Sequence, residues 1–199
     1  MRDETDAITG CVEITLEITK RKQAEQTREQ LLKDLAGREA LLWAIFENAP
    51  EGIVVCDQQG RITMTNPAAD ALYKRPVPYG QDIESQKELC CLYPDGTSYD
   101  PHDLPLVRSA LNGEICRYEE ILIEWPQSQR RWLMTNTSPI RDPEMNIFGA
   151  VGVFQDITPI KNLEQALQES EEKFSKAFYN SPSLMVISEV KDGTYIDVN

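Results

Sequence analysis

Apolar runs separated by turn residues dominate the chain from about residue 48 to residue 158. Residues 52–56 predict a strand, residues 57–60 a turn and residues 61–65 a second strand, which together form a β-hairpin. Three longer runs predict further antiparallel strands at residues 115–125, 130–140 and 147–155, separated by turns at residues 126–128 and 142–144. Two strands, short helices and three more strands indicate an α+β fold.

Helix signals lie between these strands. Asn66 followed by Pro67 is typical of an N-cap and a first-turn proline, so a short helix is predicted to begin there. Residues 74–102 contain several prolines and predict a loop with little regular structure. Residues 103–111 predict a second helix, which Asn112 and Gly113 end in a left-handed turn.

Two segments outside this unit, residues 20–47 and 159–180, are rich in Glu, Gln, Lys, Leu and Ala and predict linker helices. Apolar residues at alternating spacings of three and four form a stripe on each helix. Such a stripe favours either a coiled-coil seam or a helix that lies on its own domain. We expect a parallel homodimer through the linker helices, with a seam formed by Leu31, Leu35, Leu42, Ile160, Leu163, Leu167 and Phe174.

The chain also repeats itself, because residues 8–19 align without gaps on residues 147–158, and residues 46–50 recur as residues 178–182. A tandem array explains both repeats. Residues 1–19 are then the C-terminal tail, a last strand, of a preceding unit, and residues 181–199 are the start of a following one. Between them lie the linker helix 20–47, one complete unit at 48–158 and the linker helix 159–180. Only the complete unit is long enough to close a core.

Charge and cysteine content narrow the function. Lys and Arg total 20 against 33 Asp and Glu, which gives a net charge of −13 and an isoelectric point of about 4.6. Nucleic acids and anionic membranes repel such a chain, so neither is an expected partner. The five cysteines form no Cys-x-x-Cys pair, which indicates a reducing compartment, and neither a signal peptide nor a membrane span is expected. We expect a cytoplasmic protein.

Several motifs, taken in order, resemble the PAS domains of bacterial signalling proteins. They are Phe-Glu-Asn-Ala-Pro-Glu-Gly-Ile at 46–53, the hairpin 57–66 followed by Pro-Ala-Ala, Arg-Trp-Leu-Met at 131–134, and the segment 149–158, which ends in Asp-Ile-Thr. Residues 93–106 resemble a PAS subtype that is common in sensor histidine kinases. The resemblance implies a five-stranded antiparallel sheet in the order 2-1-5-4-3, with short helices on one face that enclose a core or pocket.

No catalytic chemistry is expected from the chain itself. His102, the single histidine, lies between prolines and outside the helical context that a phosphoacceptor needs, and no glycine-rich phosphate-binding loop or cyclase signature occurs. A cysteine pair with His102 lacks a fourth ligand, so no metal site is predicted.

Cofactor binding is likewise not expected. Cys90 and Cys91 lack the neighbours of a flavin-reactive cysteine, and His102 is a surface or capping residue rather than an axial haem ligand. Trp125 and Trp132 are interpreted as core or dimer-face aromatics. The ligand, if there is one, is not identified by the sequence. A flavin- or haem-dependent light or gas receptor is the alternative from another class.

The last strand and the second linker meet at Asp156, Ile157 and Thr158, which we predict to be a signal-relay junction. Thr158 followed by Pro159 is typical of an N-cap with a first-turn proline. The resemblance implies that this junction passes movement of the sheet into the helix. The chain is therefore interpreted as a sensory and dimerisation segment that relays a signal to an output domain outside it, most simply a histidine kinase. A passive dimer spacer is the third reading.

Overall fold

The structure, a computed structural model, describes residues 4–74, 77–125, 129–191 and 193–198, and only the backbone of residues 4–19. It divides into two compact units, Met1–Ala49 and Pro50–Asn199. In chain order the elements are α1 (Glu4–Asn48), β1 (Gly52–Asp57), β2 (Ile62–Thr65), α2 (Pro67–Tyr73), the 3₁₀ helix η1 (Ile83–Leu89), β3 (Cys91–Leu92), the 3₁₀ helix η2 (Pro101–Asp103), α3 (Pro105–Asn112), β4 (Cys116–Glu124), β5 (Arg130–Arg141), β6 (Ile147–Asp156), α4 (Thr158–Tyr179), β7 (Val186–Ser188) and β8 (Tyr195–Val198).

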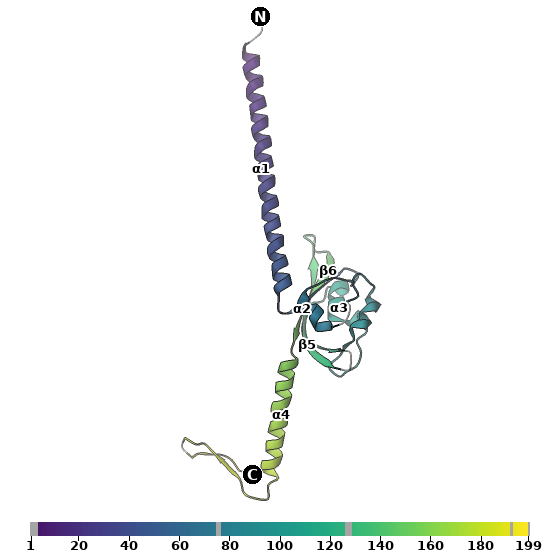
Figure 1. Cartoon of the computed structure of the whole chain (residues 1–199), viewed down its shortest axis with the longest axis vertical. Coiled ribbons are helices and arrows are strands. Elements are labelled where there is room, and N and C mark those ends of the chain that lie inside the picture. The colour runs from purple at the N-terminus through teal and green to yellow at the C-terminus, as the bar shows by residue number, and fades with distance from the viewer. Residues whose placement is uncertain (1–3, 75–76, 126–128, 192, 199) are drawn as a thin grey trace. The chain divides into compact units, whose positions relative to one another are not determined.

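The first unit is a single uninterrupted helix, α1, drawn in purple to blue in Figure 1. The predicted linker helix 20–47 lies within it. The strand predicted within residues 1–19 is wrong, because residues 4–19 continue the same helix. A strand needs a neighbouring strand to satisfy its backbone hydrogen bonds, whereas a helix satisfies them within its own segment. Membership of residues 1–19 in a preceding unit stays a prediction.

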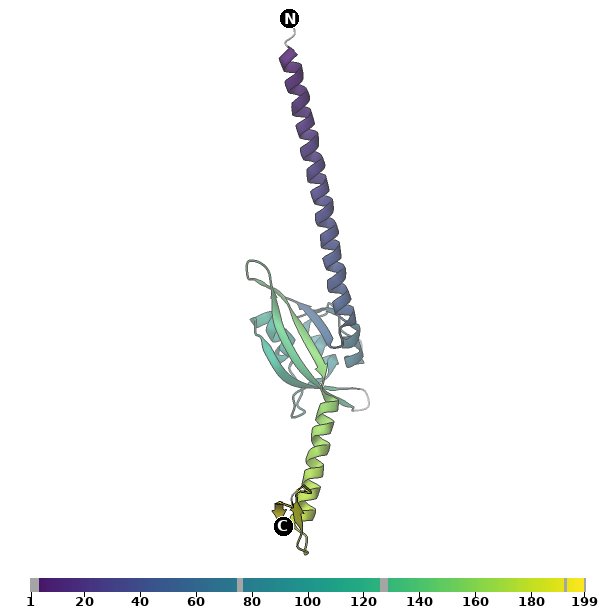
Figure 2. The ribbon, with the colours of Figure 1, turned by 90° about the vertical axis from the view of Figure 1, so that its left-hand side faces the viewer.

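The second unit is built on one antiparallel sheet in the order β2-β1-β6-β5-β4-β3. The five expected strands correspond to β1, β2, β4, β5 and β6, and their order is the predicted one. The sixth strand, β3, is a two-residue addition at the edge, where Cys91 pairs with Ile123 of β4. The short helices α2 and α3 pack on the same face of this sheet, so the fold is α+β (Figures 1 and 2).

The core lies between this face of the sheet and the short helices. Leu133 of β5 and Val107 of α3 are completely buried, and Ile121 of β4 is almost so. A polar contact ties the two layers together, because the Thr137 hydroxyl of β5 donates to the carbonyl of Pro105 at 3.0 Å. The core thus fixes α3 over the centre of the sheet.

The segment predicted as an irregular loop, residues 74–102, is more ordered than expected, since it contains η1, β3 and the start of η2. Asp82 starts η1 by accepting a hydrogen bond from the Ser85 amide at 3.1 Å, and Asp100 does the same for His102 in η2 at 2.9 Å. Side-chain caps therefore organise a stretch that its prolines alone predicted to be irregular. Residues 75–76 of this stretch, and the predicted turn 126–128, lie outside the described residues.

The second predicted linker forms α4, and a small two-stranded sheet of β7 and β8 follows it. Val186 pairs with Val198 in this hairpin, and the side chains of Leu184 and Tyr195 nearby are exposed. Within the described part of the chain, neither long helix is sufficiently long and apolar to span a bilayer.

Candidate functional site

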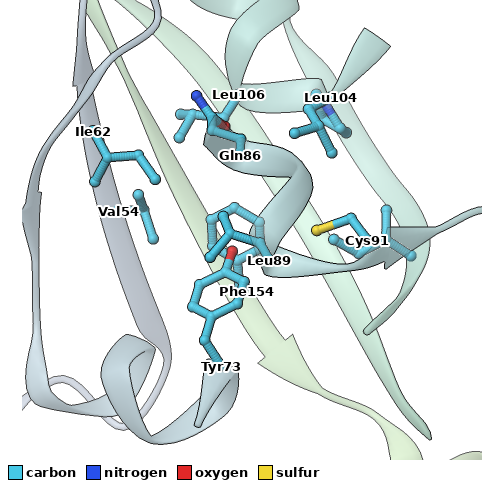
Figure 3. A pocket seen from close by; sticks show the side chains of 11 residues that line it. Val54, Ile62, Tyr73, Gln86, Leu89, Cys91, Leu104, Leu106 and Phe154 are labelled. Carbon is cyan, nitrogen blue, oxygen red and sulfur yellow. The ribbon is translucent and has the colours of Figure 1, made fainter. Parts of the chain in front are cut away.

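A small cavity lies between the inner face of the sheet and the short helices (Figure 3). Its volume is about 20 Å³, which is room for one water molecule. Strands β1, β2, β4 and β6 supply one wall, and α2, η1, β3 and the start of α3 supply the other. It is lined by Val54, Ile62, Tyr73, Gln86, Leu89, Cys91, Leu104, Pro105, Leu106, Ile121 and Phe154.

The polar groups of the cavity are few and neutral. Gln86 is buried and donates from Nε2 to the carbonyl of Gly60 at 2.7 Å, which joins η1 to the first hairpin. The Tyr73 hydroxyl points into the cavity (Figure 3), and burial raises the pKa of this group well above 10. Burial also raises the pKa of the Cys91 thiol to about 12. At neutral pH the cavity therefore offers protonated, uncharged groups and no general base.

The cavity in this form does not fit a flavin or a haem. Either group is many times larger than the space. His102 lies on the surface in η2, with Nδ1 at 3.3 Å from the Asp100 carboxylate, so it does not face the cavity. Cys91 lines the cavity but is held protonated by burial.

One cluster of possible metal ligands occurs among the described residues. Oxygen or sulfur atoms of Glu114, Cys116 and Glu119 lie within 4.8 Å of one another. The guanidinium of Arg108 reaches all three, because it contacts Cys116 Sγ at 3.0 Å, lies 3.4 Å from Glu114 and pairs with Glu119. An internal cation, Arg108, therefore already pairs with both carboxylates of this cluster and offsets part of their charge.

The junction between β6 and α4 has a defined geometry. Asp156 Oδ1 accepts a hydrogen bond from the Thr158 amide at 2.9 Å, while the other carboxylate oxygen pairs with Arg131 of β5. The N-cap predicted at Thr158 is therefore wrong. Thr158 is the first residue of α4, and its hydroxyl accepts instead from the Trp132 amide at 2.9 Å. Asp156 supplies the acceptor for the helix start, and Pro159 lies in the first turn as expected.

The same junction is bound to the central strands by further contacts. The Ile157 amide donates to the carbonyl of Trp132 at 2.9 Å. One turn into α4, Lys161 pairs with Glu120 of β4 at 2.8 Å, and its ammonium group lies 5.2 Å from the ring centroid of Trp132. The three residues of the predicted junction are thus brought together, and strands β4 and β5 hold the first turn of α4.

The ionisation of Asp156 contributes to this arrangement. Partial burial acts to raise its pKa, but hydrogen bonds from Thr158 and the Arg131 guanidinium outweigh burial and hold the pKa of Asp156 below its ordinary 3.8.

Because the folded-state pKa is depressed, the ionised Asp156 stabilises the fold above the ordinary pKa, and this contribution is lost as the pH falls through the folded-state value. We expect Asp156→Asn to lower the free energy of unfolding at pH 7 and to have a smaller effect at pH 3, below the ordinary pKa of the carboxyl group. Urea unfolding at both pH values measures this, with Glu144→Gln in an exposed turn as the control. An equal loss from Asp156→Asn at both pH values would contradict the assignment.

The apolar stripes of the two long helices are exposed within the chain. Leu31, Leu35 and Leu42 of α1 each expose more than half of their surface. On α4, Leu163 is 71% exposed and Leu167 62%, and Ile160 and Phe174 are also exposed. The rings of Phe174 and Phe178 stack at 5.5 Å. The dimer seam stays a prediction.

Two residues near the junction, Arg131 and Trp125, are not indicated by the sequence; the Arg131 guanidinium lies 4.2 Å from the centroid of the Trp125 ring. Arg131 was noted only as part of a strand motif, and Trp125 only as an aromatic of the core or dimer face. Trp125 is 5% exposed, and its indole donates to the carbonyl of Leu72 at 2.7 Å. No local signal indicates either contact, because the partners are 53 and 25 residues apart along the chain.

Comparison with known proteins supports the same architecture. A family model described as "PAS fold" matches residues 46–161. The chain is 26% identical over 152 residues to signal transduction histidine-protein kinase AtoS of Escherichia coli (strain K12), covering 75% of this chain and 23% of that protein. It is 28% identical over 138 residues to sporulation kinase E of Bacillus subtilis (strain 168), covering 69% of this chain and 17% of that protein.

The chain therefore spans less than a quarter of the length of either of these curated relatives. Among solved structures, the PAS domain from Bordetella pertussis BvgS matches with 21% identity and a TM-score of 0.47, over 69% of this chain and 98% of that one.

Proposed function

The chain belongs to the PAS fold family, and from this membership we propose that it is a sensory and dimerisation module that passes a signal through its linker helices to an output domain. The similarity to two kinases supports a histidine kinase as that output domain. The match to each kinase covers only the PAS region, and we propose that the kinase output domain lies outside this chain.

One observation carries the relay part of this proposal. The helix that leaves the sheet, α4, is tied to β5 and β4 by the contacts of Asp156, Thr158 and Lys161. A helix held at its first turn by the central strands changes its position when those strands move. This is the mechanical property that a relay to a following domain needs, and a spacer joined by a flexible loop lacks it.

We propose a cytoplasmic location and no catalytic activity of the chain itself. The described cysteines Cys56, Cys90, Cys91 and Cys116 are free thiols, as in reducing compartments. The net charge of −13 disfavours nucleic acid as a partner.

The purified chain is expected neither to bind ATP nor to label itself with phosphate, because its sequence contains no glycine-rich phosphate-binding loop and places His102 outside the helical context of a phosphoacceptor. Incubation with radiolabelled ATP followed by filter retention measures both properties. A catalytically active sensor histidine kinase serves as the positive control. Phosphate retained on the chain after denaturing wash would contradict the assignment of catalysis to another domain.

The proposed dimer uses the exposed apolar stripe of α4. Leu163→Lys is expected to weaken dimerisation at least about tenfold, because it places a charged group in a seam of leucines. Sedimentation velocity across a concentration series measures the dissociation constant. Gln165→Lys adds the same charge two residues away on α4, off the stripe, and is the matched control. A chain that is monomeric at high micromolar concentration, or variants with equal dissociation constants, would refute the seam.

A further inference from the structure

Trp125 fixes the end of α2. Its indole Nε1 donates to the carbonyl of Leu72 at 2.7 Å, and Leu72 lies in the last turn of that helix. Carbonyls in a last helical turn have no partner within the helix, so this hydrogen bond supplies one. Lys74, the C-cap of α2, holds its ammonium group 4.0 Å from the centroid of the same indole ring. Tyr73, between these two residues, lines the internal cavity.

Arg131 joins Trp125 to the start of α4. Its guanidinium carbon lies 4.2 Å from the centroid of the Trp125 ring, and one of its N–H groups donates to Asp156. A planar guanidinium can cover an aromatic face and keep its edge free for a carboxylate, which an ammonium group cannot do. Arg131 therefore makes both contacts at the same time.

Asp156 completes the connection, because its two oxygens serve different elements. One oxygen pairs with Arg131 of β5, and the other accepts from the Thr158 amide at the start of α4. The Asp156 side chain is 22% exposed and that of Arg131 37%, so water only partly screens the pair. A shift of Arg131 changes the position of the group on which the first turn of α4 depends.

We propose that Trp125 and Arg131 form a mechanical link through which displacement of α2, a wall of the internal cavity, reaches the first turn of α4. The link consists of the side chains of Trp125, Arg131 and Asp156, and is separate from the backbone hydrogen bonds between β5 and β6. It rests on the proposed function only in treating α4 as the output helix. The coupling itself belongs to this chain and requires neither a kinase nor a dimer.

Amide hydrogen exchange on the full chain tests the link. Trp125→Phe keeps a six-membered aromatic ring beside the two cations and removes the indole donor together with the pyrrole ring that carries it. We expect exchange to become about fivefold faster in the last turn of α2 and also at Lys161 in α4, the change expected for one lost hydrogen bond. Lys161 is a suitable probe because its amide donates to the Ile157 carbonyl at 3.0 Å.

Arg131→Met tests the link in the opposite direction. Coupling between two sites is reciprocal, so this change at the α4 side must also speed amide exchange at the end of α2. The probe there is the Lys74 amide, which donates to the Asp70 carbonyl. Arg130→Met is the matched control. Arg130 is the preceding residue on β5, is half-exposed, and pairs with Glu124 at 3.3 Å rather than with Asp156. This control is expected to leave both probes unchanged.

A reference amide separates coupling from general loss of stability. Val151 lies in the centre of β6, paired with both β1 and β5. Exchange that rises at Lys161 and Lys74 but not at Val151 supports the link. An equal rise in exchange at all three amides overturns the link. So does a rise at Lys161 that is no larger in Trp125→Phe than in the control Arg130→Met.

Discussion

Replacing Asn66 by alanine is expected to lower the free energy of unfolding by about 3 kcal/mol. The side chain is completely buried and hydrogen-bonds to backbone groups of Ile53, Ala69 and Glu51. Its Oδ1 accepts from the amides of Ile53 at 2.8 Å and Ala69 at 2.9 Å, and its Nδ2 donates to the carbonyl of Glu51 at 2.9 Å. With alanine at position 66, these backbone groups lose their hydrogen bonds to the buried amide side chain.

Urea unfolding of the full chain measures the loss. Asn146→Ala is the control, because Asn146 Nδ2 also donates a hydrogen bond, to Asp142, but in an exposed turn where water can replace the lost bond. Its effect is expected to stay within about 0.5 kcal/mol. A loss below about 1 kcal/mol for Asn66→Ala would mean that water reaches the vacated site and that the three hydrogen bonds contribute little.

Asn66 shows which part of a residue's role the sequence can indicate. Asn before Pro is a local signal, and Asn66 occupies the N-cap of α2 as that signal predicted. The bonds to Ile53 and Glu51 join α2 to the start of β1, and they depend on how the chain folds back. Strands and turns within the domain were predictable for the same reason, because hydrophobic period and turn residues act over a few positions.

Elements that depend on distant partners were not predicted. The short strand β3 forms only because β4 is beside it, and Cys91–Leu92 alone gives no strand signal. Residues 8–19 show the reverse case, since they resemble the segment of β6 in sequence but form part of α1. The junction at Asp156, Ile157 and Thr158 was found through a motif. The contact of Arg131 with Asp156, and that of Trp125 with the Arg131 guanidinium, join residues far apart in the chain or in different elements and carry no local signal.

The sequence also gives no sign of how differently two glycines, Gly149 and Gly37, are surrounded. Gly149 of β6 pairs with Asp57 of β1, and a β-carbon built on it would lie 2.3 Å from the carbonyl oxygen of Cys56. A β-carbon built on Gly37 of α1 would meet no described atom within 4 Å beyond the adjacent residues and the backbone of its own helix. Gly149 aligns with Gly10 in the internal repeat, yet Gly10 lies within a helix. The repeat in sequence therefore does not predict the close backbone contact of Gly149.

Gly149→Ala is therefore expected to lower the free energy of unfolding of the PAS domain by about 2 to 3 kcal/mol, because the added methyl group meets backbone that no side-chain rotation can move. The pairing of β1 with β6 must open to admit it, so amide exchange across β1 should rise together with the loss of stability. Gly37→Ala is expected to do the opposite locally, stabilising α1 by up to about 1 kcal/mol through helix propensity and leaving the domain unchanged. Urea unfolding and amide exchange on both variants measure these effects, and equal urea midpoints for the domain in the two would show that β1 and β6 do not approach this closely at Gly149.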